Sequence, residues 1–363
     1  MTIREEMLAV YYRGEPDQIP FAAYDSLVPR GQIERELRNN GMGLIKWCPV
    51  STSIAPAFLN ICVSKVQDVK ISIEEAWESG EKIIIRTFYT PMGSVFEKYR
   101  EDPMYSSKWI KKYLIESSSD YPIVKFIVEN SIIYENYNSF LQVQDNLGDD
   151  GVVLALIDRS PLQKMMYEMT GPERLFLDLY DNSDLVEDLL TSIEKKLNEM
   201  YKIAANSPAQ VIWSPDNITE DMNSPSIFRK YCLPFYNKQG QLLHQQNKAY
   251  VVHMDGKLKC LKNSIKKADI DVVESFSLPE AGGNLPIKEA SITWKDKSII
   301  SNIPAFLCLK EEKTVREYIG QLLVWVYPRK NFMLQVSEDL PHQDWKRILP
   351  VVIDVMQKQK IHK

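Results

Sequence analysis

One histidine and three acidic residues in this sequence have the chemistry of metal ligands. His253 and Asp255 lie two residues apart at the end of the apolar run A-Y-V-V, and Glu274 follows the next apolar run, D-V-V. Glu338 follows a third run, N-F-M-L-Q-V. A neutral imidazole and two or three carboxylates can hold Zn²⁺ or a harder divalent metal and leave one position open for substrate. We therefore predict a divalent metal cofactor at these four residues. The spacing alone leaves open the alternative that His253 and its acidic neighbours form only a hydrogen-bond network and bind no metal.

Other polar residues stand at the ends of similar apolar runs. Asp216 and Asn217 follow V-I-W-S-P, where they can orient a substrate or stabilise a developing anion, or only cap the next loop. Asp158 and Arg159 follow G-V-V-L-A-L-I, beside the start of a predicted helix. A guanidinium there is expected to hold a substrate carboxylate, with an ion pair to a neighbouring carboxylate as the alternative. The predicted catalytic residues are Asp216, Asn217 and Arg159, and the predicted substrate contacts are Asp158, Arg159, Asn302 and Glu280.

Six apolar runs recur between residues 151 and 339, and each ends in polar side chains. A parallel strand that is buried on both faces is apolar throughout, so polarity appears where the strand emerges at its carboxyl end. Segments of helical pattern separate the runs, and Ser160-Pro161 and Ser224-Pro225 are typical helix starts. The sequence therefore predicts an α/β fold, a TIM (β/α)8 barrel whose strand ends bring the polar residues to one rim.

The first half of the chain supplies the rest of the expected domain. Residues 2–13 predict a short helix, and the segments I-P-F-A-A-Y-D and G-L-I-K-W-C-P-V predict the two remaining barrel strands. Residues 58–100 contain longer extended segments around a turn at Thr90 to Gly93, which predicts a β-hairpin insertion that could cover the barrel mouth. Residues 109–146 are expected to be mostly helical, and residues 184–205 form the clearest helical pattern. We expect residues 1–363 to form a single barrel domain.

Composition limits the classes of partner. The chain has 363 residues and a formal net charge of −5, from interspersed acids and bases without a basic block, so we expect no binding to nucleic acid. The five cysteines have no C-x-x-C spacing, and neither a signal peptide nor an apolar run of membrane-spanning length is visible. We therefore expect a cytoplasmic protein with a small-molecule substrate and no membrane partner. Whether it forms a homodimer is left open.

Three segments of the chain resemble the uroporphyrinogen decarboxylase superfamily. They are W-S-P-D-N-I-T with the following S-P-x-x-F-x-K-Y-x-L-P, then V-H-M-D-G, and finally N-I-P with S-E-D-L-P. The resemblance implies a β/α barrel with its active site at the carboxyl ends of the strands. Decarboxylases of this superfamily carry an R-Q-A-G-R segment and a following catalytic aspartate, whereas this chain has V-P-R-G-Q at residues 28–32.

A second branch of the superfamily contains corrinoid-dependent methyltransferases, which bind zinc through H-x-C and a later cysteine. His253 matches their histidine, whereas Asp255 stands in place of the first cysteine and S-E-D at residues 337–339 in place of the second. Oxygen ligands of this kind suit a metal that polarises an oxygen or nitrogen atom of the substrate. The resemblance implies a metal-assisted transfer of a methyl group from a small O- or N-methyl substrate to a separate corrinoid protein. Two alternatives are a metal-free decarboxylase of uroporphyrinogen or a related carboxylate-rich substrate, and a non-catalytic tetrapyrrole-binding barrel.

Overall fold

The computed structural model describes residues 1–52, 66–101, 108–327, 331–341 and 343–358. Contacts between its residues group the chain into two compact units. The first unit contains Met1–Cys48, Tyr137–Leu156 and Pro208–Lys363, and the second contains Pro49–Asn136 and Ile157–Ser207. None of the helices in the described ranges combines the length and apolarity that a bilayer crossing requires.

The first unit is built on a closed barrel of eight parallel strands, as the sequence predicts. Neighbouring strands follow the order β1-β14-β13-β12-β11-β10-β9-β2 around the barrel. The strands β9 to β14 are buried along their whole length, which explains why their sequences are almost continuously apolar. The eight strands are β1 (Phe21–Tyr24), β2 (Met42–Pro49), β9 (Gly151–Leu156), β10 (Val211–Ser214), β11 (Ala249–His253), β12 (Val272–Phe276), β13 (Ser298–Asn302) and β14 (Phe332–Val336).

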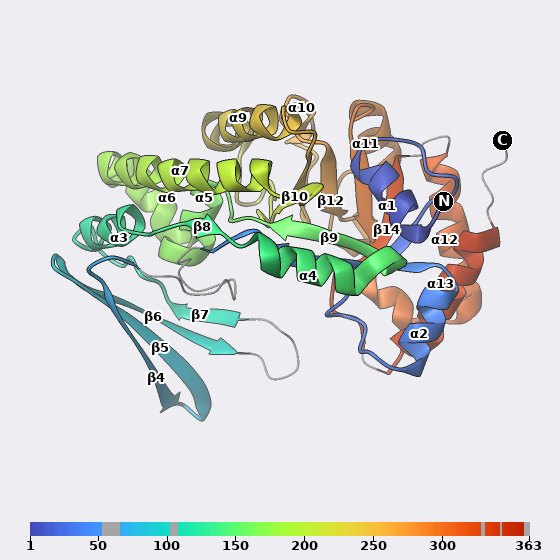
Figure 1. Ribbon diagram of the computed structural model, residues 1–363, viewed down its shortest axis with the longest axis horizontal. Helices are drawn as coiled ribbons and strands as arrows, with labels where there is room; N and C mark the ends of the chain where they lie inside the picture. The colour runs from blue at the N-terminus through green and yellow to red at the C-terminus, as the bar shows by residue number, and fades with distance from the viewer. Residues whose placement is uncertain (53–65, 102–107, 328–330, 342, 359–363) are drawn as a thin grey trace. The chain divides into compact units, whose positions relative to one another are not determined.

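Helices cover the outside of the barrel (Figure 1). The strands β11 to β14 alternate with helices, as the right-handed β/α repeat requires. Gly151, at the start of β9, lies so close to β2 that an added Cβ would stand 1.9 Å from the carbonyl oxygen of Leu44. Only glycine allows the barrel to close there. The helices of this unit are α1 (Ile3–Tyr11), α2 (Gln32–Asn39), α4 (Tyr137–Leu147), α8 (Pro225–Ile227), α9 (Leu233–His244), α10 (Lys262–Lys266), α11 (Ile287–Thr293), α12 (Glu312–Val326) and α13 (Trp345–Lys358).

Helix α1 lies across the amino-terminal end of the barrel. Thr2 and Glu5 form a capping box at its start. Arg4 donates to the carbonyl oxygen of Gly151 at the beginning of β9, and Ser298 at the beginning of β13 donates to the carbonyl oxygen of Val10. Buried residues of α1 therefore face the barrel from the end opposite to the predicted rim.

The second unit contains a four-stranded antiparallel sheet in the order β4-β5-β6-β7 (Figure 1). The predicted insertion at residues 58–100 is this sheet where it is described; its first residues, 58–65, lie outside the described ranges. The expected turn is present, because Thr90 pairs with Gly93 between β5 and β6. The strands are β4 (Lys70–Glu78), β5 (Glu81–Thr90), β6 (Gly93–Glu101) and β7 (Lys108–Lys112).

The expectation of helix from residue 109 is wrong for its first residues. Lys108–Lys112 forms strand β7 and pairs with the edge of β6. A segment of this length is too short to form a stable helix alone, so pairing with the sheet decides its structure. The helices that follow agree better with the sequence, above all the long α7. The remaining elements of this unit are β3 (Ser51–Thr52), β8 (Tyr134–Glu135), α3 (Asp120–Glu129), α5 (Pro161–Lys164), the π-helical segment η2 (Met165–Thr170), α6 (Pro172–Asp181) and α7 (Ser183–Asn206).

His244, the last residue of α9, is held by carboxylates at the amino-terminal end of the barrel. Its Nε2 lies 2.8 Å from Oδ2 of Asp271, and its Nδ1 lies 3.3 Å from Oδ1 of Asp269. Arg13 also contacts Asp271, at 3.0 Å. The hydrogen bond to Asp271 raises the pKa of His244; partial burial and Arg13 oppose this shift, and the charge of Asp269 adds to it.

We predict that His244 makes the stability of this unit depend on pH. Because its folded pKa is raised, the stabilising contribution is complete below the ordinary value near 6.5 and is lost as pH rises through the folded value. His244→Ala should therefore lower the free energy of unfolding at pH 6 by about 1 kcal/mol, since the pair is partly exposed. Urea denaturation of both proteins should show a much smaller difference at pH 9. An equal loss at both pH values would contradict this assignment.

Candidate active site

His253 and Glu274 form a buried pair between two neighbouring strands of the barrel. They are register partners on β11 and β12, and Nδ1 of His253 lies 2.7 Å from Oε2 of Glu274. The exposed fraction is 8% for His253 and 0% for Glu274. The register of β12 shifts between Val273 and Phe276, and Ser275 has a φ of 62°, so a local bulge follows Glu274 where the strand ends.

Glu274 is the centre of a hydrogen-bond network inside the barrel. Its Oε2 also accepts from Nε1 of Trp213, at 3.0 Å. Its Oε1 accepts from the hydroxyl of Tyr24 and from the amide of Gln335. Four donors from four different strands therefore occupy the hydrogen-bonding positions of both carboxylate oxygens of Glu274. Glu274 can hold His253 in place, but its oxygens are already engaged and are poorly placed to bind a metal directly.

Electrostatics make His253 and Glu274 an ion pair. Burial disfavours the charged imidazole, but the charges of Glu274 and Asp255 outweigh it and raise the pKa of His253 to about 10. Burial likewise raises the pKa of Glu274, whereas His253 and the hydrogen bonds from Gln335 and Tyr24 give a net lowering. A metal ion at Nε2 would have to replace a proton on that atom.

Two further carboxylates lie on the outer side of His253. Nε2 of His253 lies 3.4 Å from Oδ2 of Asp255, whose side chain is 26% exposed. Glu338 lies just beyond β14; its pKa is raised first by desolvation and then by the negative charge of Asp255. His253 partly offsets this shift. The exposed part of the site thus carries excess negative charge, which favours a cation.

The geometry of His253 and Asp255 fits two ligands of one metal ion. Two ligands at about 2.0–2.1 Å from a tetrahedral metal lie roughly 3.3 Å apart. The separation of 3.4 Å between Nε2 and Oδ2 is close to this value. A histidine whose Nδ1 donates to a carboxylate while Nε2 faces outward is a common arrangement around protein metals. Within the described ranges, however, no group of three or more His, Cys, Asp or Glu side chains is already gathered around one point.

Three aromatic rings pack together beside the His253–Glu274 pair. The rings of Trp47 and Trp213 stack with centroids 5.5 Å apart, and Tyr24 meets Trp47 edge-on at 4.5 Å. The ring of His253 lies edge-on to Trp213, at 5.8 Å. These contacts fix the orientation of the side chains that donate to Glu274. Sequence reasoning missed Tyr24, Trp213 and Gln335; the signal for Gln335 was a polar residue within the buried strand N-F-M-L-Q-V.

The structure places Asp216, one of the predicted catalytic residues, in a buried hydrogen-bond network at the end of β10. Its side chain is fully buried, and its carboxylate accepts hydrogen bonds from Tyr236 on α9 and from Ser214, the latter at 3.1 Å. Asp216 therefore connects the end of β10 to α9. Asn217 has a φ of 51° and begins the loop, and the next residue, Ile218, donates to the carbonyl oxygen of His253. This geometry favours the alternative in which Asp216 and Asn217 shape the loop.

We predict that Tyr236→Phe affects stability and leaves any activity unchanged. Removing the hydroxyl takes one hydrogen bond from a fully buried carboxylate, which should lower the free energy of unfolding by about 2 kcal/mol. Denaturant titration measures this loss, and an assay of the folded variant measures turnover. If turnover fell while stability stayed the same, Asp216 would belong to the reactive site after all.

Asn302 and Glu280 occupy different positions along the rim. Oδ1 of Asn302 accepts from the backbone N–H of Ser337 at 3.1 Å, and Ser337 also shares a hydrogen bond with Ser275 at 2.7 Å. Asn302 thereby fixes the segment that leads into Glu338. Glu280 lies exposed in the short 3-10 turn η4 (Pro279–Ala281) after β12.

Asp158 and Arg159 belong to the second unit and join a buried cluster of charges there. Nζ of Lys164 lies 2.6 Å from Asp158 and 2.8 Å from Glu168. Nε of Arg159 lies 3.3 Å from Glu168, and its guanidinium lies over the ring of Tyr167. The alternative expected for Arg159, an ion pair with a carboxylate, is therefore present, with Glu168 as a partner. A substrate carboxylate would have to compete with Glu168 for this guanidinium.

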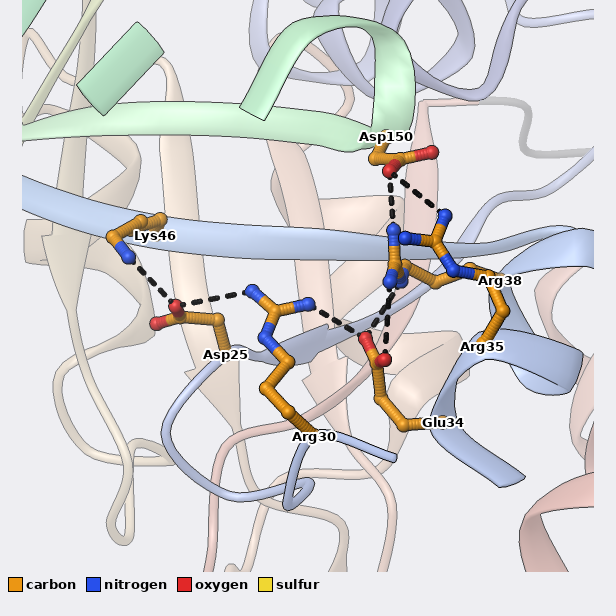
Figure 2. A network of polar contacts seen from close by, with 7 residues as sticks. All are labelled: Asp25, Arg30, Glu34, Arg35, Arg38, Lys46 and Asp150. Carbon is orange, nitrogen blue, oxygen red and sulfur yellow. Dashed lines mark hydrogen bonds and ion pairs between the residues drawn. The ribbon is translucent and has the colours of Figure 1, made fainter. Parts of the chain in front are cut away.

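A second charged network runs from Asp25, which follows β1, to Asp150, which precedes the start of β9 (Figure 2). Asp25 follows β1 and contacts Lys46 of β2 at 3.0 Å and Arg30 at 3.5 Å. Arg30 also reaches Glu34 of α2, at 2.7 Å. Figure 2 shows cations and carboxylates alternating from here to Asp150. Four cations face three carboxylates, so the network has a net positive charge; its members are Asp25, Arg30, Glu34, Arg35, Arg38, Lys46 and Asp150.

Comparison with protein families identifies this barrel. The family model described as uroporphyrinogen decarboxylase (URO-D) matches residues 133–339, more than half of the chain. The chain belongs to the URO-D family. The matched region contains β9 to β14 and therefore His253, Asp255, Glu274 and Glu338. URO-D proteins are typically enzymes, of the decarboxylase or methyltransferase-like kind.

Solved structures similar to this URO-D chain share little of its sequence. A candidate vitamin-B12 independent methionine synthase from Listeria monocytogenes is 14% identical over 61% of this chain and 68% of its own, with a TM-score of 0.37. The pneumococcal protein StrH is 8% identical over 99% of this chain and 86% of its own, with a TM-score of 0.40. A sugar phosphate isomerase/epimerase from Parabacteroides distasonis is 7% identical over 95% of this chain and 98% of its own, with a TM-score of 0.34. A comparison with curated proteins gives no match. None of these scores bears on the chemistry of this chain.

Proposed function

We propose that this URO-D protein is a metal-assisted methyltransferase. It would take a methyl group from a small O- or N-methyl substrate and pass it to a corrinoid on a separate protein. The observation that carries the proposal is the arrangement of His253, with Nδ1 fixed by Glu274 and Nε2 3.4 Å from Asp255. Such a pair is suited to presenting two ligands to a divalent metal at a solvent-accessible position.

Each residue has a distinct role in this proposal. His253 and Asp255 would bind the metal. Glu338 would complete the site, because the charge of Asp255 contributes to the raised pKa of Glu338 and the two carboxylates therefore lie near each other. Glu274 would bind no metal and would instead hold the imidazole in the tautomer that carries its proton on Nδ1. The metal would supply Lewis-acid polarisation of the oxygen or nitrogen atom that carries the methyl group. Zn²⁺ or another divalent ion would suit these ligands.

One observation favours the decarboxylase as a second candidate. The network of Figure 2 has a net positive charge, and its Arg30 and Arg35 side chains are 50% and 59% exposed. The exposed guanidinium of Arg30, beyond the end of β1, suits a substrate that is rich in carboxylates, whereas Arg35 contacts Asp150 just before the start of β9. Against this candidate, Arg30 is already paired with Glu34, and the surroundings of His253 are acidic.

An activity assay separates the two candidates. Purified protein is incubated with a reduced corrinoid protein and a panel of O- and N-methyl compounds, and formation of methylcorrinoid is followed by absorbance. A parallel sample receives uroporphyrinogen, and carbon dioxide release is measured. The methyltransferase proposal expects methylcorrinoid formation that is lost in Asp255→Ala and after chelation. Carbon dioxide release that survives a chelator, without methyl transfer from any donor, would support the decarboxylase. Tight binding of a tetrapyrrole without any product would support a binding barrel.

A further inference from the structure

The loop that follows β11 carries Asp255 and is held from both sides by the loops after the neighbouring strands. It spans residues 254–261, between β11 and α10. On one side, the backbone N–H of Glu220, in the loop after β10, donates to the carbonyl oxygen of Lys257 at 2.7 Å. On the other side, the hydroxyl of Ser277, just after β12, donates to the carbonyl oxygen of Asp255 at 2.8 Å. The three consecutive loops are therefore connected through their backbones.

Two side chains, Glu220 and Asn284, add a second connection among the same three loops. Oδ1 of Asn284 accepts from the backbone N–H groups of Leu258 and Lys259, each at 3.0 Å. Nδ2 of Asn284 donates to Oε1 of Glu220 at 2.6 Å. Oε2 of Glu220 accepts from the backbone N–H of Cys260, also at 2.6 Å. Three successive N–H groups of the β11 loop thus donate to side chains that come from the loops on its two sides.

Glycines allow these loops to approach one another so closely. Gly282 has a φ of 93°, a left-handed conformation that favours glycine. A Cβ added to Gly283 would overlap with the carbonyl oxygen of Ser277. A Cβ added to Gly256 would likewise overlap with a side chain of the loop after β10. The turn at Gly282 and Gly283 directly precedes Asn284 and brings its amide against the β11 loop.

We propose that Glu220 and Asn284 are positioning residues that hold Asp255 beside His253. His253 belongs to β11 and is fixed by Glu274, whereas Asp255 lies beyond the strand, so its place depends on the loop. The Glu220–Asn284 pair holds that loop with Oδ2 of Asp255 3.4 Å from Nε2 of His253. Residues that orient a metal ligand typically change metal affinity about 10–100-fold. This effect on affinity rests on the proposed function, but the effect on the loop does not.

Asn284→Ala removes all three hydrogen bonds of the amide side chain. In metal-free protein, hydrogen exchange at the backbone amides of Leu258 and Lys259 should become about tenfold faster, and the backbone amide NMR resonance of Asp255 should shift. Affinity for Zn²⁺, measured by titration calorimetry, should fall about tenfold. Asn237→Ala is the matched control, because Oδ1 of Asn237 accepts from a backbone N–H at the amino-terminal end of the barrel. It should leave the Asp255 resonance and the affinity unchanged.

A pair of isosteric substitutions tests the contact between the two side chains. Asn284→Asp keeps an acceptor for the two loop N–H groups but places a second carboxylate against Glu220, so it should reproduce the shift and the weaker affinity. Adding Glu220→Gln exchanges donor and acceptor. The new amide at position 220 donates to the new carboxylate at position 284, and its oxygen still accepts from Cys260. The double variant should recover the wild-type Asp255 resonance, and a Zn²⁺ affinity within about threefold of the wild-type value.

The loop and the metal are tested separately by these measurements. If wild-type protein bound no Zn²⁺, the proposed function would fail, and the exchange rates and the Asp255 resonance would still decide whether the pair holds the loop. Unchanged exchange in Asn284→Ala, an equal shift of the Asp255 resonance in Asn237→Ala, or a double variant no closer to wild type than Asn284→Asp would overturn the proposal.

Discussion

Replacing Glu274 with glutamine is expected to lower the free energy of unfolding by about 3–5 kcal/mol at pH 7. Glu274 is fully buried and faces a His253 imidazole that is charged at this pH, since its pKa is raised to about 10. The substitution keeps the shape of the side chain but leaves a buried cation without its counter-charge. It also places an amide N–H₂ among groups that are all donors. Urea denaturation of both proteins measures the difference.

Two further variants show whether the loss comes from the ion pair. Glu280→Gln removes an exposed carboxylate beyond the same strand and should change stability by less than about 0.5 kcal/mol. In the double variant Glu274→Gln, His253→Gln, no buried charge remains, so part of the lost stability should return. If Glu274→Gln cost less than 1 kcal/mol, or if the double variant were less stable by the full sum of both single losses, the network would be incorrectly assigned.

Removal of the imidazole in His253→Ala is expected to abolish stoichiometric binding of a divalent metal. Glu274→Gln should weaken metal affinity only about 10–100-fold, the range typical of residues that orient a metal ligand. Titration calorimetry with Zn²⁺ on folded protein measures both effects. His244→Ala is the matched control, because it removes the described histidine at the opposite end of the barrel and should leave the affinity unchanged. Equal loss in the His253 and His244 variants would indicate nonspecific binding.

The sequence predicts the barrel well because its signal is local and repeated. Each buried parallel strand is apolar along its length and becomes polar where it emerges, so runs such as A-Y-V-V-H identify both the strand and its carboxyl end. The edge strand Lys108–Lys112 lacks this signal, because its structure depends on pairing with β6 and its own sequence does not select a strand.

Within the site, the sequence predicts proximity better than orientation. His253, Asp255 and Glu274 were expected together, and the structure places them in contact. The expected metal-ligand role of Glu274 is harder to support, because donors from β1, β10 and β14 surround its oxygens and none of them is adjacent in sequence. Asp216 likewise contacts Tyr236 of α9, a partner that strand periodicity cannot reveal. Side-chain direction at a strand end depends on the loop that follows, which the pattern of apolar residues does not encode.

The most direct test of the central claim is an anomalous diffraction map of crystals grown with Zn²⁺, collected at the zinc absorption edge. We predict one peak per chain within about 2.3 Å of both Nε2 of His253 and a carboxylate oxygen of Asp255, with Glu274 outside the coordination sphere. Zinc bound only at other residues of well-ordered crystals, or coordinated by Glu274 after loss of its contact with His253, would contradict the account.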